Sequence, residues 1–132
     1  MKILIVEDDL TSRMVLQGLL KPYGQRHVAV NGKEAVEAAR AALAAGEPYD
    51  LICLDIMMPV MDGQEALKEI RNLEKDAGIR GRDEVKIIMM TALDDPKNVV
   101  EAYYKGGATK YLVKPIDKHL LIEAIRQLGL IG

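Results

Sequence analysis

The chain has 132 residues, of which 49% are hydrophobic and 29% are charged, and its formal net charge is −2. This length suits one domain with its own core. The balanced charge argues against a nucleic-acid-binding surface, and the single cysteine excludes an intramolecular disulfide. No apolar run approaches the roughly 20 residues of a membrane helix. We therefore expect a single cytoplasmic domain over residues 1–132 that binds neither nucleic acid nor membrane.

Short apolar runs, rich in β-branched residues, alternate with longer segments of helical periodicity. In chain order, the predicted strands are Lys2–Val6, His27–Val30, Asp50–Leu54, Val85–Met90 and Lys110–Val113. The predicted helices are Thr11–Lys21, Lys33–Ala45, Gln64–Glu74, Pro96–Lys105 and Lys118–Leu128. This alternation indicates a doubly wound α/β domain with a parallel sheet, which is either flavodoxin-like or half of a Rossmann fold.

The ends of four predicted strands carry side chains suited to chemistry. Ligands of open α/β sheets bind beyond the carboxyl ends of the strands. The side chains at these ends are Glu7, Asp8 and Asp9, then Asp55, Thr91 and Lys114. Crowded carboxylates repel one another, and a bound cation relieves that repulsion. Because all these ligands are oxygens, they select Mg²⁺, Mn²⁺ or Ca²⁺ over zinc, and Mg²⁺ combines well with phosphate oxygens.

Three of these residues suit phosphoryl chemistry in particular. Lys114 can neutralise a phosphoryl oxygen, and Thr91 can donate a hydrogen bond to another. A carboxylate can act as a nucleophile and become an aspartyl-phosphate. Asp55 is the best candidate for that role because it stands alone after an apolar strand.

Four segments, in this order, resemble the receiver domains of two-component response regulators. They are residues 5–9 with Arg13, residues 50–59 with the following Met61-Asp62-Gly63, Thr91-Ala92, and residues 111–115. Each segment alone is weak, but all four fall at predicted strand ends. The resemblance implies a flavodoxin-like, five-stranded parallel sheet of order 2-1-3-4-5 with five helices. It also implies one receiver domain with no output domain, which signals by protein–protein contact.

The resemblance further implies a role for each matching residue. Asp55 would accept a phosphoryl group from a histidine kinase or a histidine phosphotransfer protein. Mg²⁺ would be held by Glu7, Asp8, Asp55 and the backbone carbonyl of Met57. Counting back from Arg13 favours the Glu7–Asp8 pair. Asp9 is then the alternative ligand, and capping of the first helix is its favoured role.

The resemblance also implies a switch and two docking surfaces. Thr91 and Lys114 would contact the phosphoryl oxygens, and Tyr111 would turn inward behind Thr91. The Lys114–Pro115 bond would be cis. The phosphodonor would dock near Leu10, Arg13 and Met14. A downstream protein would read the face of the fourth helix, fifth strand and fifth helix, which includes Tyr103, Tyr104 and Lys110.

Such a domain catalyses only its own phosphorylation and dephosphorylation. Met57 and Leu93 stand where relatives can carry polar residues that orient the hydrolytic water, so we expect slow autodephosphorylation. A phosphatase of the haloacid dehalogenase type is an alternative, but it needs a second Asp where Met57 stands. A flavodoxin-like electron carrier would need a first loop that does not repel FMN phosphate. A receiver-like scaffold that works without phosphorylation is a third alternative.

Overall fold

The computed structural model describes residues 1–91 and 107–132. The strands are β1 (Lys2–Val6), β2 (Gln25–Ala29), β3 (Leu51–Asp55), β4 (Lys86–Thr91) and β5 (Lys110–Val113). The helices are α1 (Leu10–Leu20), α2 (Gly32–Ala44), α3 (Gly63–Asp76) and α5 (Lys118–Gln127), and short 3-10 turns cover Lys21–Tyr23 and Gly81–Asp83. The predicted helix Pro96–Lys105 lies outside the described residues, as do Leu93, Tyr103 and Tyr104.

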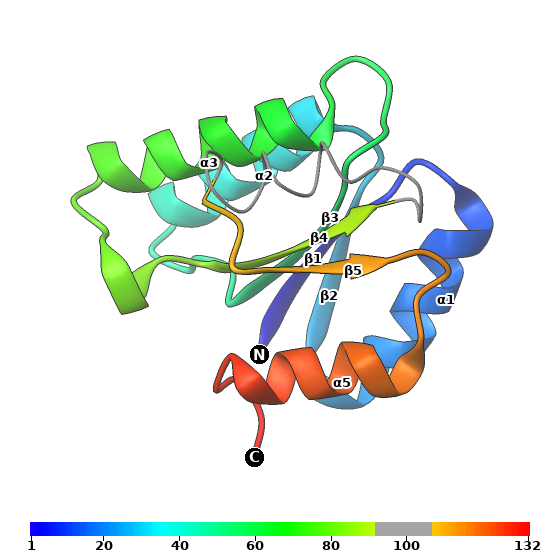
Figure 1. Cartoon of the computed structure of the whole chain (residues 1–132). Helices are drawn as coiled ribbons and strands as arrows, with labels where there is room; N and C mark the ends of the chain where they lie inside the picture. Colours follow the sequence, from blue (N-terminus) through cyan, green and yellow to red (C-terminus); the bar gives the residue numbers. More distant parts are fainter. Residues whose placement is uncertain (92–106) are drawn as a thin grey trace.

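The five strands form one parallel sheet in the order β2-β1-β3-β4-β5. This confirms the predicted flavodoxin-like topology with strand order 2-1-3-4-5. The other four predicted helices are all present in the described part of the chain. Because every strand runs the same way, the carboxyl ends of the strands meet at one edge of the sheet (Figure 1).

Helices cover both faces of the sheet. Figure 1 shows α2 and α3 on one face and α1 and α5 on the other. The alternation of side chains along β1 divides the core accordingly: Leu4 and Val6 pack with α2 and α3, and Ile3 and Ile5 pack with α1 and α5. Every residue of β3 is buried, as its continuous apolar sequence predicts for a central strand covered on both faces.

Most predicted elements differ from the observed ones by one or two residues at their ends, and β2 differs most among the strands. It begins at Gln25 instead of His27 and ends at Ala29 instead of Val30. The register pairs Lys2 with Gln25 and Ile3 with Arg26, so β2 starts where β1 starts. An edge strand exposes much of its surface, and Gln25 and Arg26 are therefore tolerated there although they break the apolar run.

Each described helix starts at a side chain that caps it. Asp9, Asn31, Asp62 and Asp117 precede α1, α2, α3 and α5, and each accepts a hydrogen bond from the backbone N–H three residues later. Such caps are worth about 1 kcal/mol each. The caps fix the residue at which each loop at the carboxyl edge of the sheet ends and the following helix begins. No helix in residues 1–91 and 107–132 combines the length and the apolar character that crossing a bilayer requires.

Candidate functional site

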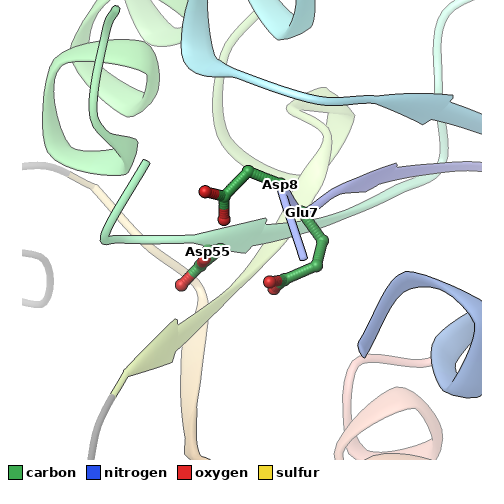
Figure 2. A group of neighbouring side chains, drawn as sticks. All are labelled: Glu7, Asp8 and Asp55. Atoms are coloured by element: carbon green, nitrogen blue, oxygen red, sulfur yellow. The ribbon is translucent and has the colours of Figure 1, made fainter. Parts of the chain in front are cut away.

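Three carboxylates from two strand ends meet at the carboxyl edge of the sheet. Glu7 and Asp8 follow β1, and Asp55 ends the adjacent β3. One oxygen from each residue lies within 4.8 Å of the others. Figure 2 shows the three carboxyl groups gathered beyond the ends of these strands. Three of the four acids singled out from the sequence, Glu7, Asp8 and Asp55, thus form one compact group.

The three acids differ in their access to solvent. Glu7 is 1% exposed and Asp55 is 3% exposed, whereas Asp8 is exposed. The backbone around Glu7 is held firmly, because its N–H donates to Ala29 O at 3.1 Å and its carbonyl accepts from Arg13 Nη1 at 3.0 Å. The Arg13 side chain therefore helps to fix the position of the acidic loop through its hydrogen bond to the backbone carbonyl of Glu7.

Lys114 joins this group from the end of β5. Its Nζ lies 2.9 Å from Glu7 Oε2 and 3.1 Å from Asp55 Oδ1. The following peptide bond, Lys114–Pro115, is cis, and the N–H of Lys114 donates to Thr91 O at 2.7 Å. The Lys114 ammonium group thus bridges the buried carboxylates of Glu7 and Asp55, although both residues are far from Lys114 in the sequence.

Burial and charge shift the pKa values of Asp55 and Lys114. Burial, followed by the neighbouring charge of Glu7, raises the pKa of Asp55 to about 6, although Lys114 and the Met57 N–H oppose the rise. Burial lowers the pKa of Lys114, but its hydrogen bond to Glu7 and the charge of Asp55 more than offset this, so that its pKa is raised. At neutral pH, Asp55 is therefore mostly an ionised, poorly solvated carboxylate, which suits a nucleophile.

Asp9 lies outside the acidic group and caps α1. Its Oδ2 accepts a hydrogen bond of 2.8 Å from Ser12 N, and this bond to the backbone is the main cause of its lowered pKa. Its geometry corresponds to the capping role that the sequence favoured over metal binding.

The other predicted residues lie at the end of β4, in the loop after β3 and on β5. Thr91 ends β4 beside β3 and is 1% exposed. The N–H of Met57 donates to Asp55 Oδ1 at 3.4 Å, while the Met57 side chain is 66% exposed. Tyr111 on β5 pairs with Met89 and is 40% exposed, so its ring is at the surface of this structure.

An apolar cavity of about 470 Å³ opens beside the site, between α1 and the loop after β5. Glu7 and Lys114 are among its lining residues, together with the apolar side chains of Val15, Leu16 and Ile116. Sequence reasoning did not single out Val15 or Ile116. The position of Ile116 directly after the Lys114-Pro115 pair is the only signal that could have indicated it.

The acidic group has the donor set of a hard divalent cation. All three side chains offer carboxylate oxygens, and neither a thiolate nor an imidazole belongs to the group. Oxygen-only ligands with one or two carboxylates are typical of Mg²⁺ sites that also take a phosphate oxygen. The residues present therefore fit Mg²⁺.

Comparison with known proteins gives the chain a family. It is 33% identical over 130 residues to the chemotaxis protein CheY of Thermotoga maritima, with 97% of each chain covered. It is 38% identical over 116 residues to the transcriptional regulatory protein ZraR of Klebsiella oxytoca. That match covers 87% of this chain and 23% of ZraR, so the chain spans about a quarter of that relative.

Solved structures agree in fold. The receiver domain of the sensor histidine kinase PA1611 from Pseudomonas aeruginosa, solved with a coordinated magnesium ion in its active-site cleft, matches at a TM-score of 0.76 and 30% identity, with 97% of both chains covered. The receiver domain of Ssk1 from Saccharomyces cerevisiae, solved with the histidine phosphotransfer protein Ypd1, matches at a TM-score of 0.82 and 30% identity, covering 98% of this chain and 88% of that one. A family model described as the response regulator receiver domain matches residues 3–126. The chain therefore belongs to the receiver domains of two-component signalling.

Proposed function

We propose that Asp55 is the phosphoacceptor of this receiver domain and that a phosphohistidine protein is its donor. The observation that carries the proposal is the position of Asp55: it is buried, shares an acidic group with Glu7 and Asp8, and lies 3.1 Å from Lys114 Nζ. A lone structural carboxylate would be costly in that setting. A role of Asp55 in phosphoryl transfer would explain why a carboxylate is buried at this position.

The reaction transfers one phosphoryl group. An Asp55 carboxylate oxygen attacks phosphorus, a P–O bond forms, and the P–N bond to the donor imidazole breaks. The imidazole leaves with the electron pair of that bond and takes up a proton. The Met57 N–H orients the Asp55 carboxylate, and the Lys114 ammonium, already 3.1 Å from Asp55 Oδ1, lies where negative charge accumulates.

Glu7, Asp8 and Asp55 would hold Mg²⁺, together with the Met57 carbonyl. When bound, the cation supplies neutralising charge to the phosphoryl oxygens. Thr91 would donate its hydroxyl to a phosphoryl oxygen. Asp9 is not included in this ligand set, because its carboxylate caps α1.

Acetyl phosphate tests the acceptor directly, because a small donor needs no docking surface. We expect intact-protein mass spectrometry to show one added phosphoryl group in the presence of Mg²⁺, and none in Asp55→Asn or after chelation. Glu37→Gln is a matched control for the loss of one negative charge, since Glu37 is an exposed residue of α2. Labelling that persists in Asp55→Asn would show that another residue is the acceptor.

We further propose that the phosphorylated domain acts in the cytoplasm and signals through a protein that binds the face of β5 and α5. Tyr111 and Leu120 are 40% and 61% exposed on that face, and they line a hollow of about 190 Å³ with Lys110. Reorientation of Thr91 and Tyr111 on phosphorylation would change this surface. A pull-down with the beryllofluoride complex as bait, against the untreated chain, tests for a partner that depends on the phosphorylated state.

A further inference from the structure

The sulfur atoms of the chain differ sharply in their access to solvent. All seven methionines and the one cysteine lie within the described residues. Two methionine side chains are largely open to solvent, Met57 at 66% and Met14 at 61% exposure. The other five methionines are half-buried or buried against the core on one face of the sheet or the other: Met1, Met58, Met61, Met89 and Met90.

The thiol of Cys53 is closed to oxidants. Cys53 lies on the central strand β3 and is 0% exposed, and burial raises its pKa to about 12. Because the thiolate is the form that oxidants attack, a covered and protonated thiol is inert. Oxidation of sulfur in this chain therefore falls on the thioethers, and exposure directs it to Met57 and Met14.

Met57 is the exposed methionine that lies next to the proposed phosphoacceptor. It is the second residue after Asp55, and its N–H donates to Asp55 Oδ1 at 3.4 Å. From this backbone position, three rotatable bonds allow the sulfur to reach the space beside the carboxylate. The next residue, Met58, turns its side chain to the core, so the two methionines of this loop differ in environment although they are neighbours.

Oxidation changes what the Met57 side chain offers to a water molecule. A thioether sulfur is a weak hydrogen-bond acceptor, whereas a sulfoxide is polar and carries an oxygen that accepts hydrogen bonds. The water that hydrolyses an aspartyl-phosphate has to be held in line with the P–O bond that breaks. The reduced side chain does not hold such a water, and the sulfoxide oxygen does.

We propose that Met57 is a redox-sensitive modification site, at which oxidation by a peroxide to the sulfoxide shortens the lifetime of the phosphoryl group on Asp55. This inference rests on the proposed function of Asp55. The thioether sulfur attacks one oxygen of hydrogen peroxide, an S–O bond forms and the O–O bond breaks. The leaving hydroxide takes up the proton of the transferred oxygen and becomes water. Sulfur is oxidised by two electrons, and the peroxide is reduced.

The oxidised side chain then acts on hydrolysis. The sulfoxide oxygen of Met57 accepts a hydrogen bond from the attacking water, whose oxygen forms a new bond to phosphorus. The P–O bond to Asp55 breaks, and its electron pair stays on the carboxylate. Inorganic phosphate leaves, and one proton passes to solvent. An oxidant in the surroundings would thereby reset the domain without contact with its phosphodonor.

The experiment compares the wild type with Met57→Leu, which has no thioether at this position, and with the matched control Met14→Leu. Each protein is treated with hydrogen peroxide until peptide mass spectrometry shows that Met57 of the wild type is mostly oxidised, and catalase then removes the peroxide. Acetyl phosphate with Mg²⁺ labels the treated and untreated samples. After removal of acetyl phosphate, intact-protein mass spectrometry follows the loss of the phosphoryl group.

We expect Met57 and Met14 to be oxidised before the five covered methionines. The oxidised wild type should lose its phosphoryl group about fivefold faster than the untreated protein, which is the acceleration that one hydrogen bond to the attacking water supplies. Met14→Leu should show the same acceleration on treatment, and Met57→Leu should show none. Methionine sulfoxide reductases of both stereospecificities should restore the slow rate.

Four results would overturn the proposal. They are unchanged or slower loss of phosphate in the oxidised wild type, complete failure of that sample to be labelled, acceleration that persists in Met57→Leu, and a fast rate that the reductases do not reverse. A urea midpoint that falls on oxidation of Met57 would assign the acceleration to damage of the fold and would overturn the proposal as well. Failure of the proposed function has a different signature, because acetyl phosphate would then leave Asp55 of the untreated wild type unlabelled.

Discussion

Replacing Asp55 by Asn should make the metal-free domain more stable at neutral pH, although it removes the acceptor. Folding buries the Asp55 carboxylate beside Glu7, and these two effects raise its pKa from 3.8 to about 6 despite the attraction of Lys114. Burial thus penalises the ionised form. Asn has nearly the same shape and no charge, so it escapes this penalty.

The size of the effect follows from the pKa difference. About two units at about 1.4 kcal/mol each give a cost of about 3 kcal/mol for ionised Asp55 in the folded state. Since the folded pKa is the higher one, the folded chain binds the proton more tightly between about pH 4 and pH 6. The free energy of unfolding therefore falls as the pH rises through this interval and is constant above it, as far as Asp55 is concerned.

Urea unfolding in EDTA, followed by far-UV circular dichroism, measures the difference. At about pH 8, Asp55→Asn should be more stable than the wild type by up to about 3 kcal/mol, or about 10 °C in Tm. Near pH 4 the difference should approach zero. Glu37→Gln, on the exposed surface of α2, should change the stability by less than about 0.5 kcal/mol at either pH.

Mg²⁺ provides a second arm of the same experiment. The cation should stabilise the wild type by mass action and thereby reduce the advantage of Asp55→Asn, which has lost one ligand. A variant that is equally or less stable than the wild type in EDTA at about pH 8 would refute the reasoning. It would mean that the attraction of Lys114 for Asp55 outweighs the cost of burial.

Three further predictions concern Arg71 on α3 and two residues of the site, Lys114 and Met57. Arg71→Ala should lower the free energy of unfolding by about 3–5 kcal/mol in a urea titration, because it leaves Glu74, 3% exposed, without the 2.7 Å ion pair. Lys114→Ala should raise the pKa of Asp55 further, so that labelling by acetyl phosphate slows more at about pH 6 than at about pH 8; an equal loss at both would contradict this. Met57→Asn should speed the loss of phosphate from the labelled domain, since Asn can orient a water and Met cannot, whereas Met57→Leu should leave the rate unchanged.

The site was predictable because a parallel sheet imposes its geometry. Once five apolar runs are assigned to parallel strands, the residues after them share one edge, whatever the details of packing. Glu7, Asp55 and Lys114 lie at the ends of three different strands, and the Lys114 ammonium group is still within hydrogen-bonding distance of both carboxylates. The sequence did not show that the acids differ in solvent exposure: Glu7 is buried, whereas Asp8 is exposed.

Polar pairs that join distant segments were not predictable. Arg71 and Glu74 look like an exposed pair on α3, but Arg71 Nη1 also donates to Val85 O at 2.8 Å and Glu74 Oε2 accepts from Val85 N at 2.6 Å. His27 had no recognisable partner in the sequence, and its Nδ1 lies 2.7 Å from the hydroxyl of Tyr49. Such bonds satisfy backbone and side-chain groups that only the folded chain brings together.

The backbone conformation of Val60 was not predictable for a different reason: the local preference of valine disagrees with the conformation that the structure has there. Val60 has a φ of 69° and lies in a γ-turn that the hydrogen bond from Met61 N–H to Pro59 O closes at 2.8 Å. Residue type argues against positive φ at a valine, so no pattern in the sequence could indicate this turn. The turn exists because Gly32 and Gly63 allow the chain to close tightly around it. Natural sequences are otherwise locally consistent with their folds, and the exceptions concentrate at functional sites. At Val60, therefore, contacts between segments far apart in the sequence decide the backbone conformation against the preference of the residue itself.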